Sequence, residues 1–190
     1  MEHIKLGFAM CGSFCTFDSV LDLLELMRET YDDIYPIMST ISYSTDTRFG
    51  SAESFRNRMQ FICGREIIHT IAQAEPIGPK KMLNVLVIAP CTGNTLAKLA
   101  NGIADTPVTL AAKAHLRNEA PIVIAVSTND ALCGNAENIG KLMARGHYYF
   151  VPMRQDAPNG KPRSVVADFS LITDTVELAL KGKQIQPILL

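Results

Sequence analysis

The first stretch of the chain with residues suited to chemistry is CGSF at residues 11–14, directly after a short apolar run at residues 4–10. A turn that contains glycine lets backbone N–H groups approach an anion, and the start of a following helix adds a partial positive charge. The segment nearly matches a P-loop from Gly7, but Ser13 stands where that loop needs lysine, and the GxGxxG fingerprint is absent. A phosphate monoester therefore fits this turn best, and a plain strand-to-helix turn is the alternative.

Two further segments place small polar residues directly after apolar runs. The first is APCTGNT at residues 89–95, and the second is STND at residues 127–130. Helix capping explains one such residue in each segment, because Ser, Thr and Asn are preferred at helix starts. It does not explain three polar segments that follow three strands of one sheet. Ligands bind beyond the carboxyl ends of parallel strands, so together these segments favour a ligand site at that edge.

The elements that must position these segments alternate along the chain. Strand-like segments occupy residues 4–10, 34–40, 83–89, 121–126 and 148–151. Helix-like segments occupy residues 16–30, with Thr16 as N-cap, 54–74, with a break at Gly64, 94–101, 107–117, 136–145 and 170–180. Residues 42–51 and 153–164 are polar and turn-rich, which is typical of loops. This order predicts one α/β domain over residues 1–190, doubly wound and Rossmann-like or flavodoxin-like, with helices flanking a parallel sheet.

Bulk composition excludes several classes of protein. The formal net charge of −1 gives no reason to expect a nucleic-acid partner. No apolar run reaches the length of a membrane span, and the first residues lack a signal-peptide pattern. The five cysteines have no paired spacing and no nearby histidine that completes a zinc set, so we expect free thiols in a reducing cytoplasm and no metal.

The run APCTGNTLAKLANGIADT at residues 89–106 resembles the signature of the homo-oligomeric flavin-containing Cys decarboxylase superfamily, which reads approximately PATANTxAKxAxGxADN. The segment at residues 11–14 is similar to the Gly-Ser phosphate turn of that family. The matching signature positions are Pro90, Thr92, Asn94, Thr95, Ala97, Lys98, Ala100, Gly102, Ala104 and Asp105.

The resemblance implies flavin mononucleotide (FMN) as the cofactor and assigns residues to it. The residues implied to receive the FMN phosphate are Gly12, Ser13 and Phe14, with Ser39 or Thr40 closing over it. The residues implied to line the ribityl chain and ring are Pro90, Thr92, Asn94 and Thr95. Asn129 falls where the decarboxylases have the asparagine of their PxMNxxM motif.

The chain departs from the decarboxylases at their active site. Their active-site histidine lies at a characteristic sequence spacing before the signature proline. The corresponding position here, counted back from Pro90, is occupied by Pro76. The proline and the first methionine of the PxMNxxM motif are both missing, and Thr128 stands at the methionine position. His69 is the nearest histidine, and we expect it in an amphipathic helix, as a surface or core residue. These departures make decarboxylation doubtful.

The phrases GFAMCGSFCTF, STDTRFG, EPIGPK and NDALCGNAENIG resemble one branch of the superfamily, found in spore-forming bacteria. Its members work beside a dehydrogenase-like partner protein in forming pyridine-2,6-dicarboxylate from a dihydro- or hydroxytetrahydro precursor. The resemblance therefore implies an oxidoreductase subunit, NADP on the partner, and the mother-cell cytoplasm. A flavin-dependent decarboxylase and a non-catalytic accessory subunit stay as alternatives.

A dicarboxylate substrate needs cations, because guanidinium and ammonium groups pair with carboxylates. The candidates in loop-like segments are Arg48, Arg154, Lys161 and Arg163, with solvated surface charges as the alternative. The superfamily resemblance also implies a trimer-based homo-oligomer. The apolar tail at residues 185–190 is either part of an interface or packs back onto the domain, and the loop at residues 153–164 suits a mobile cover.

Overall fold

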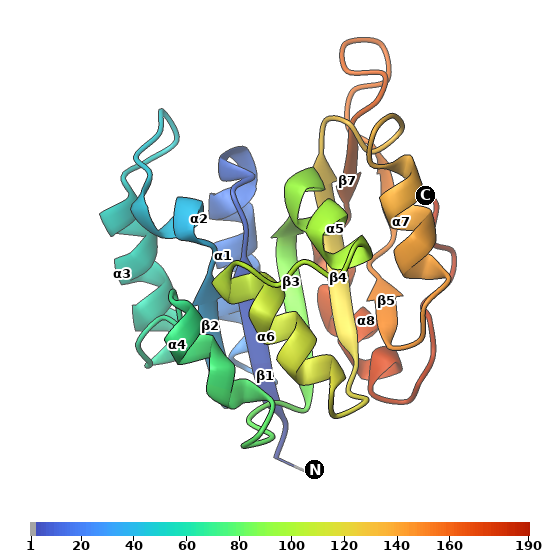
Figure 1. The fold of residues 1–190 in the computed structure, drawn as a ribbon. Coiled ribbons are helices and arrows are strands. Elements are labelled where there is room, and N and C mark those ends of the chain that lie inside the picture. Colours follow the sequence, from blue (N-terminus) through green and yellow to red (C-terminus); the bar gives the residue numbers. More distant parts are fainter. Residues whose placement is uncertain (1–2) are drawn as a thin grey trace.

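The computed structural model describes residues 3–190. Its central sheet has the strand order β2-β1-β3-β4-β7-β6, and β5 pairs with β4 (Figure 1). The first five strands pair in parallel, while β7 is antiparallel to β4 and to β6. The predicted α/β fold with a parallel sheet between helices is confirmed.

The parallel strands are short and apolar, which suits strands covered on both faces. β3 is the clearest case, because all of its residues are buried. The strand bounds are β1 (Lys5–Met10), β2 (Asp33–Met38), β3 (Val85–Cys91), β4 (Ile122–Thr128), β5 (Tyr148–Phe150), β6 (Met153–Gln155) and β7 (Val165–Ala167).

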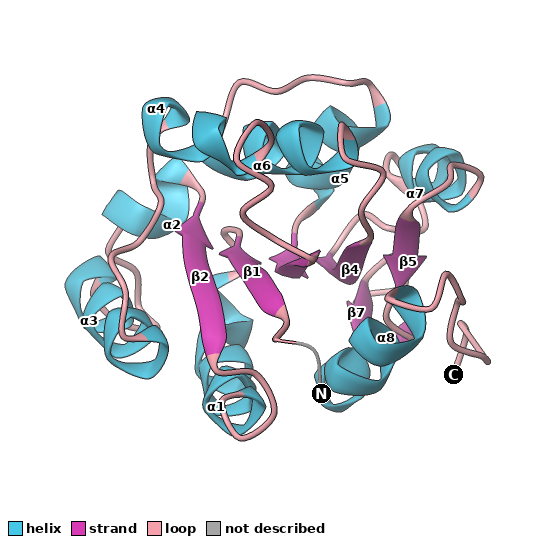
Figure 2. Cartoon of the chain, turned by 90° about the horizontal axis from the view of Figure 1, so that it is seen from below, coloured by secondary structure: helices cyan, strands magenta, loops and turns pink. Residues whose placement is uncertain are grey.

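The helices form a layer on each face of the sheet. Figure 2 shows α4, α5 and α6 along one face, with α7 beyond them, and α1 and α8 on the other face. The helix bounds are η1 (Phe14–Thr16), α1 (Phe17–Met27), α2 (Thr40–Ser44), α3 (Ala52–Cys63), α4 (Ile71–Ala74), η2 (Glu75–Ile77), α5 (Gly93–Ala100), α6 (Pro107–Leu116), α7 (Ala136–Met143), η3 (Phe169–Leu171) and α8 (Ile172–Ala179). Because each helix returns the chain to the start of the next strand, the loops after β1, β3 and β4 all open at one edge.

The break predicted at Gly64 in the helix over residues 54–74 is confirmed, and residues 71–74 are helical again as α4, but residues 65–70 are not helical. Gly64 ends α3 in the left-handed region at φ 63°, and Ile68 then forms a bridge beside Ile37 of β2. Glycine is the residue that adopts this conformation without cost, so the helix ends there. The loop predicted at residues 42–51 is also partly wrong, because its first residues belong to α2.

Residues 153–164 are not entirely loop. Residues 153–155 form β6, which pairs with β7, and the segment between the two strands projects beyond the carboxyl edge in Figure 1. Strands of three residues are too short to carry a usable periodicity, which is why the sequence did not reveal them.

The C-terminal tail packs back onto the domain in part. The Met153 N–H donates to the Ile188 carbonyl at 2.8 Å, and Ile188 contacts the core, while Leu189 remains 74% exposed. None of the helices within residues 3–190 is long and apolar enough to cross a membrane.

Candidate functional site

The loops after β1, β3 and β4 surround a cavity of about 760 Å³ at the carboxyl edge of the sheet. Sites for small molecules and cofactors commonly have volumes of about 300–1,000 Å³. The residues that line this cavity come from the three predicted polar segments, the turn at residues 48–49, and the β6–β7 hairpin. They are Gly12, Ser13, Phe14, Cys15, Thr16, Arg48, Phe49, Thr92, Gly93, Asn94, Ser127, Thr128, Asn129, Asp130, Asp156, Lys161, Ser164, Val165 and Val166.

The turn after β1 is joined to the end of β4. Ser13 Oγ lies 2.8 Å from Ser127 Oγ, so one hydroxyl pair bridges the first and third loops. The chain then forms the short helix η1 before α1 starts at Phe17. Thr16 occupies the predicted N-cap position of α1, but its side chain makes no capping hydrogen bond. Its hydroxyl donates to the Ser13 carbonyl at 2.8 Å instead, which helps to close the turn.

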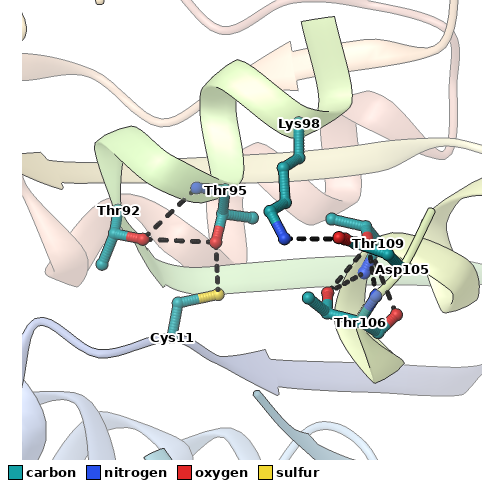
Figure 3. Close-up of polar contacts among 7 residues, drawn as sticks. All are labelled: Cys11, Thr92, Thr95, Lys98, Asp105, Thr106 and Thr109. Carbon is teal, nitrogen blue, oxygen red and sulfur yellow. Dashed lines mark hydrogen bonds and ion pairs between the residues drawn. The ribbon is translucent and has the colours of Figure 1, made fainter. Parts of the chain in front are cut away.

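The loop after β3 divides its polar residues between the cavity and the protein interior. Thr92 is the N-cap of α5: its hydroxyl accepts from the Thr95 N–H at 3.4 Å. Thr95 is buried, and its hydroxyl donates to Cys11 Sγ at 3.3 Å (Figure 3). Of the residues implied by the family signature, Thr92 and Asn94 line the cavity, whereas Thr95 and Pro90 do not, because Pro90 lies inside the buried strand β3.

The later half of the signature organises the connection from α5 to α6. Lys98 Nζ lies 2.7 Å from Asp105 Oδ1, and the hydrogen bond from Lys98 lowers the pKa of Asp105 (Figure 3). Thr106 and Thr109 form a reciprocal cap at the start of α6. These four residues do not line the cavity. Their role in the structure is to fix the return of the chain after α5.

The loop after β4 contains a hydrogen-bonded network that the sequence did not reveal. The Thr128 hydroxyl donates to Asp130 Oδ1 at 2.6 Å, and the Asn135 amide donates to Asp130 Oδ2 at 2.7 Å. The Asn138 amide donates in turn to Asn135 Oδ1 at 2.9 Å. Asn129, which the family resemblance implied, is exposed and lines the cavity beside this network.

Gly93 at the start of α5 is packed against the same network. A Cβ on Gly93 would clash with Asn135 Nδ2 and would lie 2.6 Å from Asp130 Oδ1 and 2.8 Å from Thr128 Oγ1. Real Cβ atoms do not approach polar atoms this closely. The loops after β3 and β4 therefore meet at a point where only glycine fits.

Two of the four predicted cations lie at the cavity. Arg48 is exposed, with its guanidinium 4.9 Å from the Phe49 ring centroid, and Lys161 pairs with Asp156 at 3.1 Å. Arg154 and Arg163 do not line it. Arg154 lies in β6, where it pairs with Asp168 at 3.4 Å, so its predicted placement in a loop is wrong.

Ser39 and Thr40 are not brought to the cavity either. Ser39 is buried and caps α2: its hydroxyl accepts from the Ser42 N–H at 3.3 Å and lies 2.7 Å from Ser42 Oγ. Thr40 is exposed on the first turn of α2. The α2 helix starts directly after β2 and uses Ser39 as its N-cap, which commits that hydroxyl to a structural role.

The thiols beneath the loops are held in the protonated form. Burial raises the pKa of Cys11 to about 11, although the hydrogen bond from Thr95 lowers it in part. Burial also raises the pKa of Cys91 well above its ordinary value. Because the thiolate is the reactive form, neither residue is suited to act as a nucleophile. Cys15, in contrast, is exposed and lines the cavity.

His69 is not in a helix, contrary to expectation. It lies between the bridge residue Ile68 and Thr70, the N-cap of α4, with its ring stacked on Tyr43 at 3.8 Å between centroids. Its Nδ1 lies 3.0 Å from the Ile67 carbonyl, and it does not line the cavity. Pro76 lies in η2 and has no group that can carry a proton.

Sequence reasoning identified the segments of the site but missed several of its residues. Ser127, Thr128 and Asp130 belong to a segment that the sequence singled out, yet only Asn129 was assigned a role there. Asp130 directly follows Asn129, and a carboxylate in this otherwise neutral polar segment was the signal available from the sequence. Asp156 and Ser164 lie in the charged segment at residues 153–164, where only the cations were considered.

Comparisons with known proteins agree with this arrangement. Residues 1–177 match the Flavoprotein family. The chain is 42% identical over 185 residues to the B subunit of dipicolinate synthase from Bacillus subtilis (strain 168), covering 97% of this chain and 92% of that protein. The crystal structure of the B subunit of dipicolinate synthase from Bacillus halodurans superposes with a TM-score of 0.90 and 42% identity, over 98% of this chain and 96% of that one. The FMN-dependent cysteine decarboxylase SpaF superposes with a TM-score of 0.66 and 25% identity, over 93% and 97% of the two chains.

Proposed function

The chain belongs to the Flavoprotein family, and from this premise we propose that it is the FMN-binding subunit of a dipicolinate synthase. The observation that carries the proposal is the 42% identity to the B subunit of a dipicolinate synthase over 97% of the chain. The cavity at the carboxyl edge of the sheet supports it, because ligands of open α/β sheets bind there.

The cavity fits FMN in size and in the chemistry of its walls. Gly12 and Ser13 would receive the phosphate through backbone N–H groups and a hydroxyl. Thr92, Asn94 and Asn129 would line the ribityl chain and ring with groups that donate and accept hydrogen bonds. When bound, FMN would supply hydride acceptance, which is the redox step that aromatisation of a dihydropyridine requires.

The proposed substrate is a dihydro- or hydroxytetrahydro precursor of pyridine-2,6-dicarboxylate. Arg48 and Lys161 would hold its carboxylates, because they are the predicted cations that line the cavity. Lys161 already has a carboxylate partner in Asp156, at 3.1 Å. A substrate carboxylate would therefore compete with Asp156 for this ammonium group, and Arg48 is the freer of the two cations.

The proposal includes a second protein. The relative from Bacillus subtilis is named as one subunit of its synthase, so we propose that this chain works with the other, the dehydrogenase-like A subunit of dipicolinate synthase, which holds NADP. We also propose that it assembles into a trimer-based homo-oligomer and works in the mother-cell cytoplasm during sporulation. Leu189 and Leu190 remain exposed after the tail has packed back, and they are available to such an interface.

A decarboxylase is the weaker candidate. The similarity to the cysteine decarboxylase SpaF favours it, but no histidine lines the cavity among residues 3–190. Pro76 cannot transfer a proton, and the pKa values of Cys11 and Cys91 are raised by burial. The groups that surround the cavity therefore suit cofactor and carboxylate binding better than the proton transfer that accompanies decarboxylation.

The proposed function is tested by measuring pyridine-2,6-dicarboxylate formation with this chain alone, with its dehydrogenase-like partner alone, and with both together. The assay contains FMN, oxidised NADP and the hydroxytetrahydro precursor. We expect product only from the mixture, and a loss of that product when this chain carries Gly12→Val. Full activity from this chain alone would refute the two-protein proposal, and full activity from the partner alone would refute an enzymatic role for this chain.

A further inference from the structure

The network after β4 has a fixed hydrogen-bond direction. A carboxylate only accepts hydrogen bonds, so both groups that contact Asp130 must donate to it. The Thr128 hydroxyl therefore commits its single proton to Asp130 Oδ1, 2.6 Å away. The Asn135 amide likewise turns its NH₂ group toward Asp130 Oδ2, and this orientation agrees with the bond that Asn135 Oδ1 receives from Asn138.

After this donation the Thr128 hydroxyl has no proton left for a ligand, and it can only accept a hydrogen bond from one. The hydroxyl oxygen retains accepting capacity, and no other group within residues 3–190 donates to it. Thr128 and Asp130 both line the cavity. At Thr128 and Asp130 the wall consequently presents acceptors, and the Asp130 charge disfavours an anion placed against these two side chains.

Backbone hydrogen bonds and the packing of Gly93 also hold the network in place. The Asp130 carbonyl accepts from the Cys133 and Asn135 N–H groups at 3.0 and 3.2 Å, which fixes the loop backbone. The close approach of Gly93 then leaves the three polar side chains no space to rotate toward α5. Asp130 and Thr128 are thus preorganised before any ligand arrives.

We propose that Asp130 is a positioning residue that sets the hydrogen-bond polarity of this wall through Thr128. The ligand group that lies against the Thr128 hydroxyl is then an N–H or O–H donor, and a phosphate or carboxylate oxygen is excluded from that contact. This inference rests on the proposed function, since FMN carries such donors in its ribityl hydroxyls and its ring N–H. It places the anionic end of the cofactor away from Asp130.

The test is a double-mutant cycle on FMN affinity, and the affinity is measured from the quenching of flavin fluorescence on binding. Thr128→Val removes the acceptor at nearly constant shape, and Thr128→Ser keeps the hydroxyl as a matched control. Asp130→Asn replaces one accepting oxygen by a donating NH₂ group, so the side chain can no longer accept from both Thr128 and Asn135. One hydrogen bond corresponds to about a 3- to 10-fold change in affinity, so Thr128→Val and Asp130→Asn should each weaken FMN binding by about that factor. Thr128→Ser should bind FMN like the unmodified protein.

The combined variant decides whether Asp130 acts through Thr128. If it does, Asp130→Asn should weaken FMN binding no further in the Thr128→Val background. Additive effects would show that Asp130 acts on the fold instead and would overturn the inference. Unchanged FMN affinity in both single variants would overturn it as well. Failure of the unmodified protein to bind FMN would instead refute the proposed function.

Discussion

Replacing Gly93 by alanine tests the meeting point of the loops after β3 and β4. In an ordinary helix this change is stabilising, because glycine costs about 1 kcal/mol relative to alanine. Here the new Cβ would lie closer than 3.0 Å to polar atoms of Asn135, Asp130 and Thr128. These atoms are bonded to one another, so none can move away without breaking a hydrogen bond.

The expected magnitude follows from these contacts. Overpacking costs about 1–3 kcal/mol, and leaving one buried polar group unpaired costs about 1–3 kcal/mol more. After subtracting the helix-propensity gain of about 1 kcal/mol, we expect Gly93→Ala to lower the free energy of unfolding by about 1–5 kcal/mol. For a chain of 190 residues this corresponds to a fall in Tm of roughly 2–20 °C.

Gly140 provides the matched control. It lies within α7, is exposed, and has nothing within 4 Å of the Cβ that alanine would add. Gly140→Ala should therefore raise the free energy of unfolding by about 0.5–1 kcal/mol, in the opposite direction. Urea unfolding measures both variants, provided that the slope m is unchanged. Equal and positive shifts for the two variants would refute the claim that the network excludes a side chain at Gly93.

Three other predictions concern pH, labelling and reaction specificity. Burial lowers the pKa of His115 to about 4 from its ordinary 6.5, so the unfolded chain binds the proton first, and the free energy of unfolding should fall by up to about 3 kcal/mol as the pH falls from 6.5 to 4. His115→Gln should remove that part of the pH dependence in urea unfolding, and an identical pH profile in the variant would contradict it. FMN should slow alkylation of Cys15, which lines the cavity, but not of Cys133, a second exposed free thiol that lies outside the cavity and accepts from Arg163 Nη1 at 3.1 Å. Equal protection of both thiols by FMN, read by mass spectrometry, would contradict the site. The protein should release no carbon dioxide from peptidyl cysteine or phosphopantothenoylcysteine, because Pro76 cannot transfer a proton, and detected release would overturn that interpretation.

The sequence was sufficient for features that depend on local pattern. Apolar runs of strand length, each followed by a helical repeat, predicted the parallel sheet, and small polar residues after strands located the cavity edge. The helix break was visible in the same way, since Gly64 is the residue type that ends a helix in the left-handed region.

Features that depend on contacts between distant segments could not be predicted. Thr95 and Asn94 are neighbours with similar chemistry, yet Thr95 turns inward to Cys11 and Asn94 faces the cavity. Which of them faces the ligand depends on the rotation of α5, which is set by packing. The role of Asp130 likewise exists only because β4 places Thr128 beside α5 and α7.

The central claim, that the turn at Gly12 and the cavity beside it hold FMN, is tested most directly by an absorption and fluorescence titration. The unmodified protein and Gly12→Val are compared. A Cβ on Gly12 would lie 3.1 Å from Ile41 Cγ2, and Ile41 is 58% exposed and free to move, so the variant should fold normally. We predict saturable FMN binding with a perturbed flavin spectrum for the unmodified protein, and no measurable binding for the folded variant. No binding by the unmodified protein, or equal affinity in both, would contradict the account.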